Sequence, residues 1–249
     1  MAPTPERAEV KVGRFDPARV FPPGDKLTVP LFRLMMATGD ARCASLLFVM
    51  ADQEVRNTSG AESALHAGRM WYLFRLLCSH LSEAGYALDT LLSSVPRQRL
   101  RKLLRGRPVA PEELERLREA LGDGTYVRKV RHSIGSHYSH DDIKRVYEAD
   151  LTAGRVDGSL IACDVGALSR FTITDVLALR LMDDAAGATT HEEFSDRTGE
   201  VVTLAEDLST VVVHMVAALL KENGVQATVE TVEVPAVFRA ARDWAENSQ

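Results

Sequence analysis

Apolar residues recur at helical spacing through most of the chain, a pattern that predicts a mainly helical protein. Two helices are predicted over residues 27–38 and 41–55, with a break between them at Gly39 and Asp40. A third begins near Ser63 and carries the clearest apolar stripe, which covers about seven turns. The stripe consists of Leu65, Leu73, Leu77, Leu81, Ala84, Leu88 and Leu91.

Prolines mark the starts of the next two predicted helices. Pro96 opens a short basic helix over residues 97–105. Pro111, followed by two glutamates that suit the first turn of a helix, opens another, which ends at Gly122. The middle of the chain therefore continues the helical pattern in shorter pieces.

A helix break is predicted around Gly135. The helix that starts at Tyr126 is expected to end there, because glycine readily adopts the left-handed conformation of a helix C-cap. The next helix is predicted over residues 141–151. His137 and Tyr138 therefore fall in the gap between two helices.

The C-terminal third combines an irregular region with two helices. Residues 154–172 contain glycines and β-branched residues, which favours a loop or a short pair of strands. Residues 174–186 and 192–222 return to helical spacing, and the second helix carries an a/d seam. The seam consists of Val201, Leu204, Leu208, Val211, Met215 and Ala218. Residues 225–234 alternate as a strand does, and residues 236–245 are predicted to form a last helix.

Length and composition fit one large domain with an extension. The chain has 249 residues, of which 45% are hydrophobic and 26% charged, as in ordinary soluble globular proteins. We expect residues 1–24, which hold five of the ten prolines, to be a flexible N-terminal segment. Residues 25–152 are expected to form a bundle of four or more helices. Residues 153–249 are expected to form a C-terminal helical extension packed on it, with a small irregular or β element.

The sequence predicts a cytoplasmic protein with no membrane partner. We find no apolar run that approaches the ~20 residues of a membrane span, and the most apolar window, residues 211–220, is interrupted by His214. Prolines and a glutamate occupy residues 3–6, where a signal peptide needs apolar residues. The cysteines lie far apart and without metal-ligand spacing, so we expect a reducing compartment and no metal site. They are Cys43, Cys78 and Cys163.

Charge is distributed unevenly along a chain whose net charge is −5. Residues 97–147 hold thirteen Lys or Arg against seven Asp or Glu, whereas residues 148–249 hold seven against eighteen. One run of eleven residues has six cations and no acid: Arg97, Arg99, Arg101, Lys102, Arg105 and Arg107. Such a run is either a solvated helix face or a surface that follows a phosphate backbone regardless of sequence.

The strongest candidate site lies in the stretch VRKVRHSIGSHYSHDDIKRVYEADL. Arg131 is followed by a polar residue, His132, and by a second histidine, His137, beyond the predicted break. On a continuous helix six residues leave the two side chains about 120° apart, and a break at Gly135 lets His137 turn back toward Arg131. An Arg and a His that converge on a phosphate can cleave RNA without a metal. Arg128 and Lys129 add nearby positive charge.

Structural alternatives stand beside this prediction. Arg131 and His137 can equally form surface ion pairs with Asp141 or Asp142, because an Arg four to six residues ahead of a His also arises by chance. The second such match, Arg75 with His80, is better interpreted as a buried polar network with Glu83 on the third helix.

RHSIGSH followed by YSHDDIKRVYE resembles the Arg–(four to six residues)–His motif of the HEPN superfamily, in particular its branch related to phage abortive-infection proteins. LTVPLFRLMMATGDARCASLLF and HAGRMWYLFRLLCSHLSEA are similar to the first helices of that branch, so the resemblance covers residues 27–151. It implies a HEPN-like helical bundle, a homodimer and a cleft between two copies of the motif. Members with an intact motif are metal-independent endoribonucleases, often toxins or antiviral effectors, and others only bind.

The resemblance therefore predicts a metal-independent endoribonuclease without cofactors, in phage defence or a toxin–antitoxin setting. Arg131 would stabilise the phosphate, His137 would act as general acid and base, and His132 and Tyr138 would assist. The partners would be RNA, a second copy and an antitoxin protein. RNA would be guided by Arg97, Arg99, Arg101, Lys102, Arg105, Arg128 and Lys129. The alternative is a non-catalytic homodimeric module of the same fold, which would use the stripe of the third helix or the a/d seam.

Overall fold

The computed structural model of the chain describes residues 7–105, 111–132, 140–153, 160–161, 170–187 and 191–235. The helices of these residues are α1 (Pro17–Val20), α2 (Thr28–Asn57), α3 (Gly60–Ser94), α4 (Arg97–Leu104), α5 (Pro111–Ala120), α6 (Tyr126–Val130), α7 (His140–Thr152), α8 (Thr172–Ala186) and α9 (His191–Glu222). The strands are β1 (Arg7–Arg14), β2 (Leu160–Ile161), β3 (Arg170–Phe171) and β4 (Thr228–Pro235). The prediction of a mainly α protein is confirmed.

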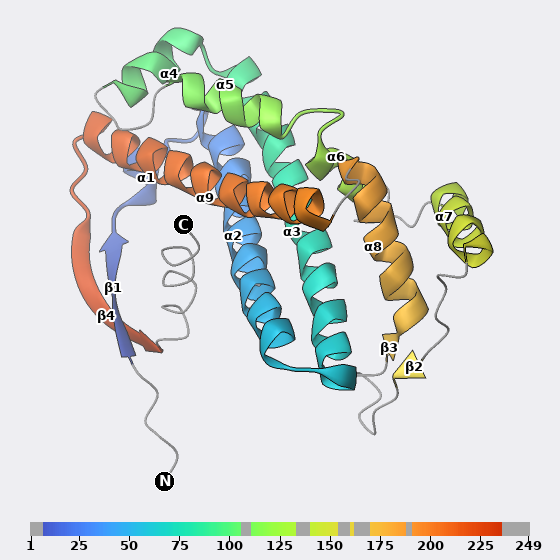
Figure 1. The fold of residues 1–249 in the computed structure, drawn as a ribbon. Coiled ribbons are helices and arrows are strands. Elements are labelled where there is room, and N and C mark those ends of the chain that lie inside the picture. The colour runs from blue at the N-terminus through green and yellow to red at the C-terminus, as the bar shows by residue number, and fades with distance from the viewer. Residues whose placement is uncertain are drawn as a thin grey trace.

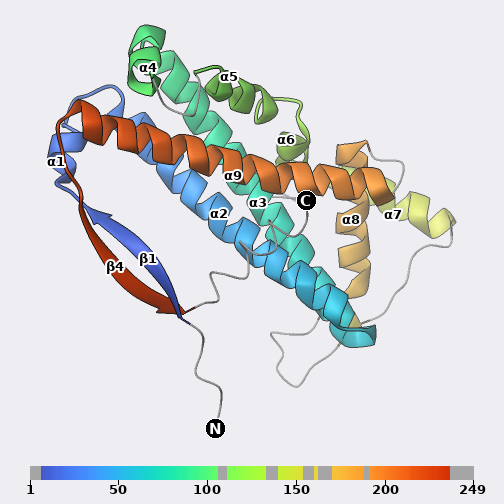
Figure 2. The same ribbon diagram turned by 60° about the vertical axis from the view of Figure 1, so that its left-hand side comes forward.

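A long antiparallel hairpin of α2 and α3 forms the centre of the molecule (Figure 1). The connection between them is short, and Gly60 opens α3 with a φ of +62°, a left-handed conformation that glycine adopts at little cost. Helix α9 crosses this hairpin, while α4 and α5 lie on one side of α9 and α8 lies beside α3 (Figure 2). Buried residues from Val20 to Val225 join in one core, so the C-terminal helices pack on the same core as the hairpin.

The predicted break at Gly39 and Asp40 is wrong, because α2 is continuous from Thr28 to Asn57. Both residues are exposed, and Asp40 lies 3.8 Å from His80 of α3. The low helix propensity of Gly39 costs about 1 kcal/mol, and the neighbouring buried positions Ala37 and Ala41 offset that cost by packing.

Both predicted apolar stripes are buried against other helices of the same chain. From Leu73 onward the stripe of α3 is buried, as is the a/d seam of α9 apart from Leu204, which is half-buried. Arranged in this way, neither stripe is free to hold a second copy. A homodimer, which stays a prediction, requires another surface.

An antiparallel pair of strands joins the two ends of the chain. In the N-terminal segment that the sequence predicted to be flexible, Arg7–Arg14 forms β1, which pairs with β4 from Arg7↔Pro235 to Arg14↔Thr228. The predicted strand over residues 225–234 is confirmed by β4. A second small pair, β2 with β3, falls in the region predicted as a loop or a short pair of strands. The division of the chain into three segments stays a prediction.

Acidic residues of the C-terminal third pair with basic residues of the preceding helices. Within the described residues, four ion pairs of this kind connect α8 and α9 to α2, α4, α5 and α7. They are Arg42–Glu206 (3.0 Å), Lys102–Glu222 (3.6 Å), Arg116–Asp207 (2.7 Å) and Arg145–Asp184 (2.7 Å). The uneven charge of the sequence is thus partly neutralised within the chain.

In the described part of the chain, two helices, α2 and α9, are long and apolar enough to cross a membrane by length and composition alone, contrary to the expectation from the sequence. About half of the most apolar window of each is buried inside the chain, 50% for α2 and 44% for α9. Core helices of soluble proteins have the same properties. A cytoplasmic location without a membrane partner therefore stays a prediction.

Candidate functional site

Helix α6 places the first part of the Arg–His motif against α3. Val127 and Val130 are buried, and they anchor this short helix between α3 and α8. Arg131 and His132 continue it as a π-helical turn. Residues 133–139 lie outside the described part of the chain, and with them His137 and Tyr138, so the structure places Arg131 and His132 of the predicted catalytic group.

Arg131 is held by two residues of α3. Its Nη2 atom donates a hydrogen bond to Oε1 of Glu83 at 2.6 Å, and its guanidinium carbon lies 5.6 Å from the ring centre of Tyr86. The side chain of Arg131 is 24% exposed, whereas its Nε atom is buried and has no acceptor among the described residues. The guanidinium is therefore fixed in position, with part of its donor capacity unused.

Arg128, which the sequence placed among the RNA-contacting cations, is buried. It is only 1% exposed, its Nε donates to the carbonyl oxygen of Leu121 at 2.8 Å, and its guanidinium carbon lies 3.4 Å from the ring centre of Tyr86. Residues three apart share one face of a helix, so Arg128 and Arg131 both point toward α3. Arg128 is buried because the face of α6 that carries it packs against α3.

Two guanidinium groups thus meet at the ring of Tyr86, and one of them, that of Arg131, is hydrogen-bonded to the carboxylate of Glu83. Within the described residues, Arg128 forms no ion pair, and its Nη1 atom is buried without an acceptor. Glu83 is the one acidic partner of the pair and is itself 48% exposed. The cluster of Arg128, Arg131, Glu83 and Tyr86, named here the Tyr86 cluster, therefore keeps an excess positive charge and unused N–H donors next to the motif.

The other two residues of the motif region that were assigned a role lie on the surface. His132 and Lys129 are both exposed, at the end of α6 and on its outer side. The nearby Asp142, proposed from the sequence as a partner of Arg131, lies 3.5 Å from Arg145. The partner of Arg131 is thus Glu83.

The cations of the basic helix α4 differ in their exposure and in their ion pairing. Arg99 is bound to Asp25 through two hydrogen bonds of 2.6 Å, and this contact lowers the pKa of the Asp25 carboxyl below its ordinary range. Lys102 lies 3.6 Å from Glu222 yet is 74% exposed. Arg101 and Arg105 are exposed and form no ion pair with the described residues. Leu100, Leu103 and Leu104 are buried and form the apolar side of α4.

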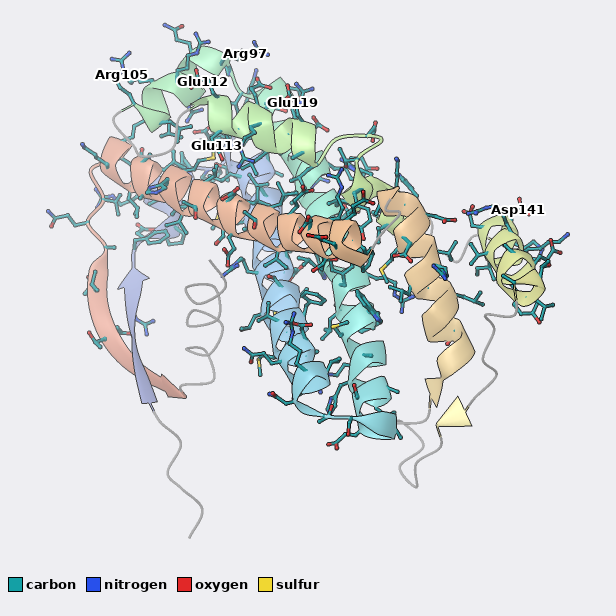
Figure 3. All side chains as sticks on the ribbon, in the orientation of Figure 1. Arg97, Arg105, Glu112, Glu113, Glu119 and Asp141 are labelled. Carbon is teal, nitrogen blue, oxygen red and sulfur yellow. The ribbon has the colours of Figure 1, made fainter. Side chains whose placement is uncertain are left out.

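Acidic residues of α5 lie beside this basic helix. Figure 3 shows Arg97 and Arg105 at the two ends of α4, with Glu112, Glu113 and Glu119 on the neighbouring α5. Arg97 of α4 is 3.3 Å from Glu115, which also belongs to α5. The field of α4 is therefore weaker than the sequence run alone indicates.

The basic helix and the motif lie at opposite ends of α5 (Figures 1 and 2). A helix of ten residues spans about 15 Å. Arg101 and Arg105 therefore cannot contact the same phosphate as Arg131, and they are placed for a more distant part of a polyanion.

Of the expected network of Arg75, His80 and Glu83, two members have partners outside it. Glu83 pairs with Arg131, and His80 instead lies 3.8 Å from Asp40 of α2. The guanidinium of Arg75 lies 6.0 Å from the ring centre of Tyr72. Glu83 and Tyr86 were not identified from the sequence as partners of Arg131, because this role follows only from the packing of α6 on α3.

Among the described residues, no three His, Cys, Asp or Glu side chains gather as they would around a metal ion. In comparisons with known protein families, curated protein sequences and solved structures, no match was found for this chain. Its function is therefore inferred from the residues themselves.

Proposed function

We propose that the chain is a metal-independent endoribonuclease of the HEPN type, acting in phage defence or a toxin–antitoxin setting, with Arg131 and His137 as its catalytic residues. The proposal rests on the resemblance of the motif and on the position of Arg131. A homodimer and an antitoxin protein are part of the same proposal.

The observation that carries the proposal is the Tyr86 cluster. A pentacoordinate phosphorane carries more negative charge than the phosphodiester from which it forms, so donors already fixed at that point stabilise it selectively. Arg131 supplies such a donor at the end of α6, and Arg128 beneath it adds a second positive charge. Glu83 is the carboxylate that an RNA phosphate would have to displace from Arg131.

The proposed reaction is an internal transfer of the phosphoryl group. The 2′-hydroxyl attacks the adjacent phosphorus, the new bond to O2′ forms, and the bond to the 5′-oxygen of the next nucleotide breaks. His137 accepts the proton of the 2′-hydroxyl, and His132 or Tyr138 donates a proton to the leaving oxygen. The products carry a 2′,3′-cyclic phosphate and a 5′-hydroxyl.

RNA binding is proposed to use two separate surfaces. Lys129 and His132 lie next to Arg131, whereas Arg97, Arg101, Lys102 and Arg105 lie at the far end of α5. Arg99 takes no direct part in RNA binding, because its guanidinium is bound to Asp25. Arg128 takes none either, because it is buried and donates to the carbonyl oxygen of Leu121.

The test is cleavage of total and transfer RNA in EDTA by the wild-type chain and by Arg131→Ala and His137→Ala variants. We expect fragments with cyclic phosphate ends from the wild type and a loss of at least 100-fold in each variant, about 2.7 kcal/mol of transition-state stabilisation. Arg56→Ala is the matched control, because Arg56 also pairs with one carboxylate but lies at the far end of α2. Equal cleavage by all four proteins would sink the proposal.

The second candidate is a non-catalytic interaction module, which an exposed apolar row on α2 favours. Val29, Phe32 and Met36 share one face of that helix and are 65%, 39% and 71% exposed. Soluble proteins rarely leave such a row unused. The absence of cleavage by a folded wild-type chain, together with RNA binding that does not depend on Arg131, would favour this candidate.

A further inference from the structure

Helix α2 is apolar on its outer face as well as on the face that packs on α3. Only 50% of its most apolar window is buried inside the chain. The outer row of α2 consists of Val29, Phe32, Met36, Cys43 and Leu47, which share one face of the helix and are all exposed. The row is about 27 Å long. A helix that is apolar all round is normally covered all round, so the outer row is a surface for a partner.

Two opposite charges flank the outer row. Arg33 is exposed and forms no ion pair with the described residues, whereas Asp40 is 63% exposed and lies 3.8 Å from His80. Arg33 and Asp40 are seven positions apart, close to two turns, so they lie on the same flank of α2. The midpoint between them falls next to Met36, which at 71% is the most exposed apolar residue of the row.

A second copy of the chain matches this arrangement. In a contact with twofold symmetry, a residue i meets a residue j of the other copy, and j meets i. An antiparallel pair of α2 helices with its axis near Met36 therefore brings Arg33 of each copy to Asp40 of the other. A parallel pair brings opposite flanks of the two helices together, and Arg33 and Asp40 would not meet.

The same register also pairs the apolar residues of the outer row. Val29 lies opposite Cys43 of the second copy, and Met36 lies opposite Met36. Charge and apolar pattern are thus complementary to themselves about one point of the helix. This self-complementarity indicates a second copy as the partner, because a symmetric interface requires it.

We propose that the outer row of α2 is a homodimer interface, in which two copies of this helix pack antiparallel about a twofold axis near Met36. The inference rests on the proposed function for the expectation of a homodimer, and it names the surface and the register. The apolar row supplies the affinity, and the pairs of Arg33 with Asp40 fix the register, because exposed ion pairs contribute little free energy. The surface is separate from the Tyr86 cluster, which belongs to α3 and α6.

The first experiment measures the mass of the full chain by light scattering over a range of concentrations. We expect a dimer for the wild type and a single chain for Met36→Glu, which places two like charges at the axis and leaves the fold intact because Met36 is exposed. Leu151→Glu is the matched control, since Leu151 is a 55% exposed apolar residue of α7, and it should stay dimeric. A single chain for the wild type, or a dimer that Met36→Glu does not change, would overturn the proposal. A single wild-type chain that sediments with phosphatidylcholine vesicles would overturn it in favour of a lipid surface.

Charge reversal tests the register. Arg33→Glu places two acidic groups at each former ion pair, so we expect the dissociation constant of the dimer to rise about tenfold. Asp40→Arg should have a similar effect. The double variant should recover the wild-type constant, because each ion pair forms again with its charges exchanged. Effects that simply add in the double variant would contradict the antiparallel register.

Cysteine cross-linking tests the same register by distance, in a Cys163→Ser background. The two copies of Cys43 would lie about 21 Å apart along the helix axis, too far for a disulfide. Val29→Cys brings a second thiol opposite Cys43, so we expect diamide to link two copies of this variant and none of the background protein. The reverse result would rule out the proposed pairing. None of these measurements involves RNA, so their failure is distinct from a failure of the cleavage test on Arg131 and His137.

Discussion

Arg131 Nη2 and Glu83 Oε1 lie 2.6 Å apart, so a single hydrogen-bonded ion pair ties the end of α6 to a helix 48 positions earlier in the chain. The same carboxylate is the natural competitor of any anion at Arg131. It follows that the charge of Glu83 controls how much of the guanidinium is free, and the position can be tested without changing the motif itself.

Glu83→Gln should strengthen RNA binding. The variant keeps the size of the side chain but removes the competing charge, so we expect affinity for a cleavage-resistant RNA to rise about fivefold, the equivalent of ~1 kcal/mol. The pair is partly exposed, so the free energy of unfolding should fall by no more than about 1 kcal/mol. Fluorescence anisotropy at fixed salt measures the first effect. Asp52→Asn, which frees the distant Arg56, is the control, and an affinity equal to that of the wild type would show that RNA does not reach Arg131.

Tyr126→Phe should leave the protein as stable as the wild type or more stable. The hydroxyl of Tyr126 is buried without a partner among the described residues, and burial raises the pKa of this group. Removal of an unsatisfied polar group should raise the free energy of unfolding by up to about 1 kcal/mol, while the ring keeps its contact with Phe74. Urea denaturation of the variant and the wild type measures this change in the free energy of unfolding. A loss of more than ~1 kcal/mol would mean that the hydroxyl has a partner after all.

Gly85→Ala and Gly39→Ala should act in opposite directions although both glycines lie within long helices. A Cβ atom at Gly85 would lie 2.7 Å from the carbonyl oxygen of Leu121, and backbone cannot easily move aside. We expect a loss of about 1–3 kcal/mol in the free energy of unfolding. At Gly39 a Cβ meets nothing within 4 Å, so higher helix propensity should add about 0.5–1 kcal/mol. Thermal melts of the two variants side by side decide this, and the same sign for both would contradict the packing of α3 on the segment before α6.

Asp25→Asn should remove a contribution to stability that depends on pH. Arg99 lowers the pKa of Asp25 below its ordinary value of 3.8 in the folded chain. A lowered carboxyl pKa means that the stabilisation is fully present above that ordinary value and is lost as the pH falls through the folded value. We expect the variant to be about 1 kcal/mol less stable at neutral pH and to approach the wild type as the pH falls through the lowered pKa of the folded chain. A difference that does not change between these pH values would show that the pair contributes through shape alone.

Local periodicity predicted the helices well and their continuity less well. The stripe from Leu73 to Leu91 repeats with the period of a helix, so its burial follows from the sequence. Gly39 was misjudged, because propensity describes an isolated helix and the packing of α2 on α3 outweighs it. The strand β1 was missed although Val10 and Val12 alternate with polar residues, since its partner follows more than two hundred residues later.

At the candidate site, too, local sequence predicted one part, and tertiary packing determined the rest. Arg131 was found because a motif is a local property of the sequence. Glu83 and Tyr86 were not identified as its partners, because α6 must pack on α3 before they meet Arg131. Arg128 was assigned to the surface for a related reason: sequence gives its charge, and only the structure gives its burial beneath Tyr86.

The pairing of β1 with β4 has a consequence for synthesis of the chain. Arg14 and Glu230, which bond across the two strands, are separated by 216 positions, so on a ribosome that adds about 5–20 residues per second β1 emerges at least ~10 s before its partner. During synthesis this sheet can therefore close only after the residues of helices α1 to α9 have been made. A ribosome that stalls before residue 228 would release a chain whose first strand keeps an open edge, the kind of edge on which aggregates grow.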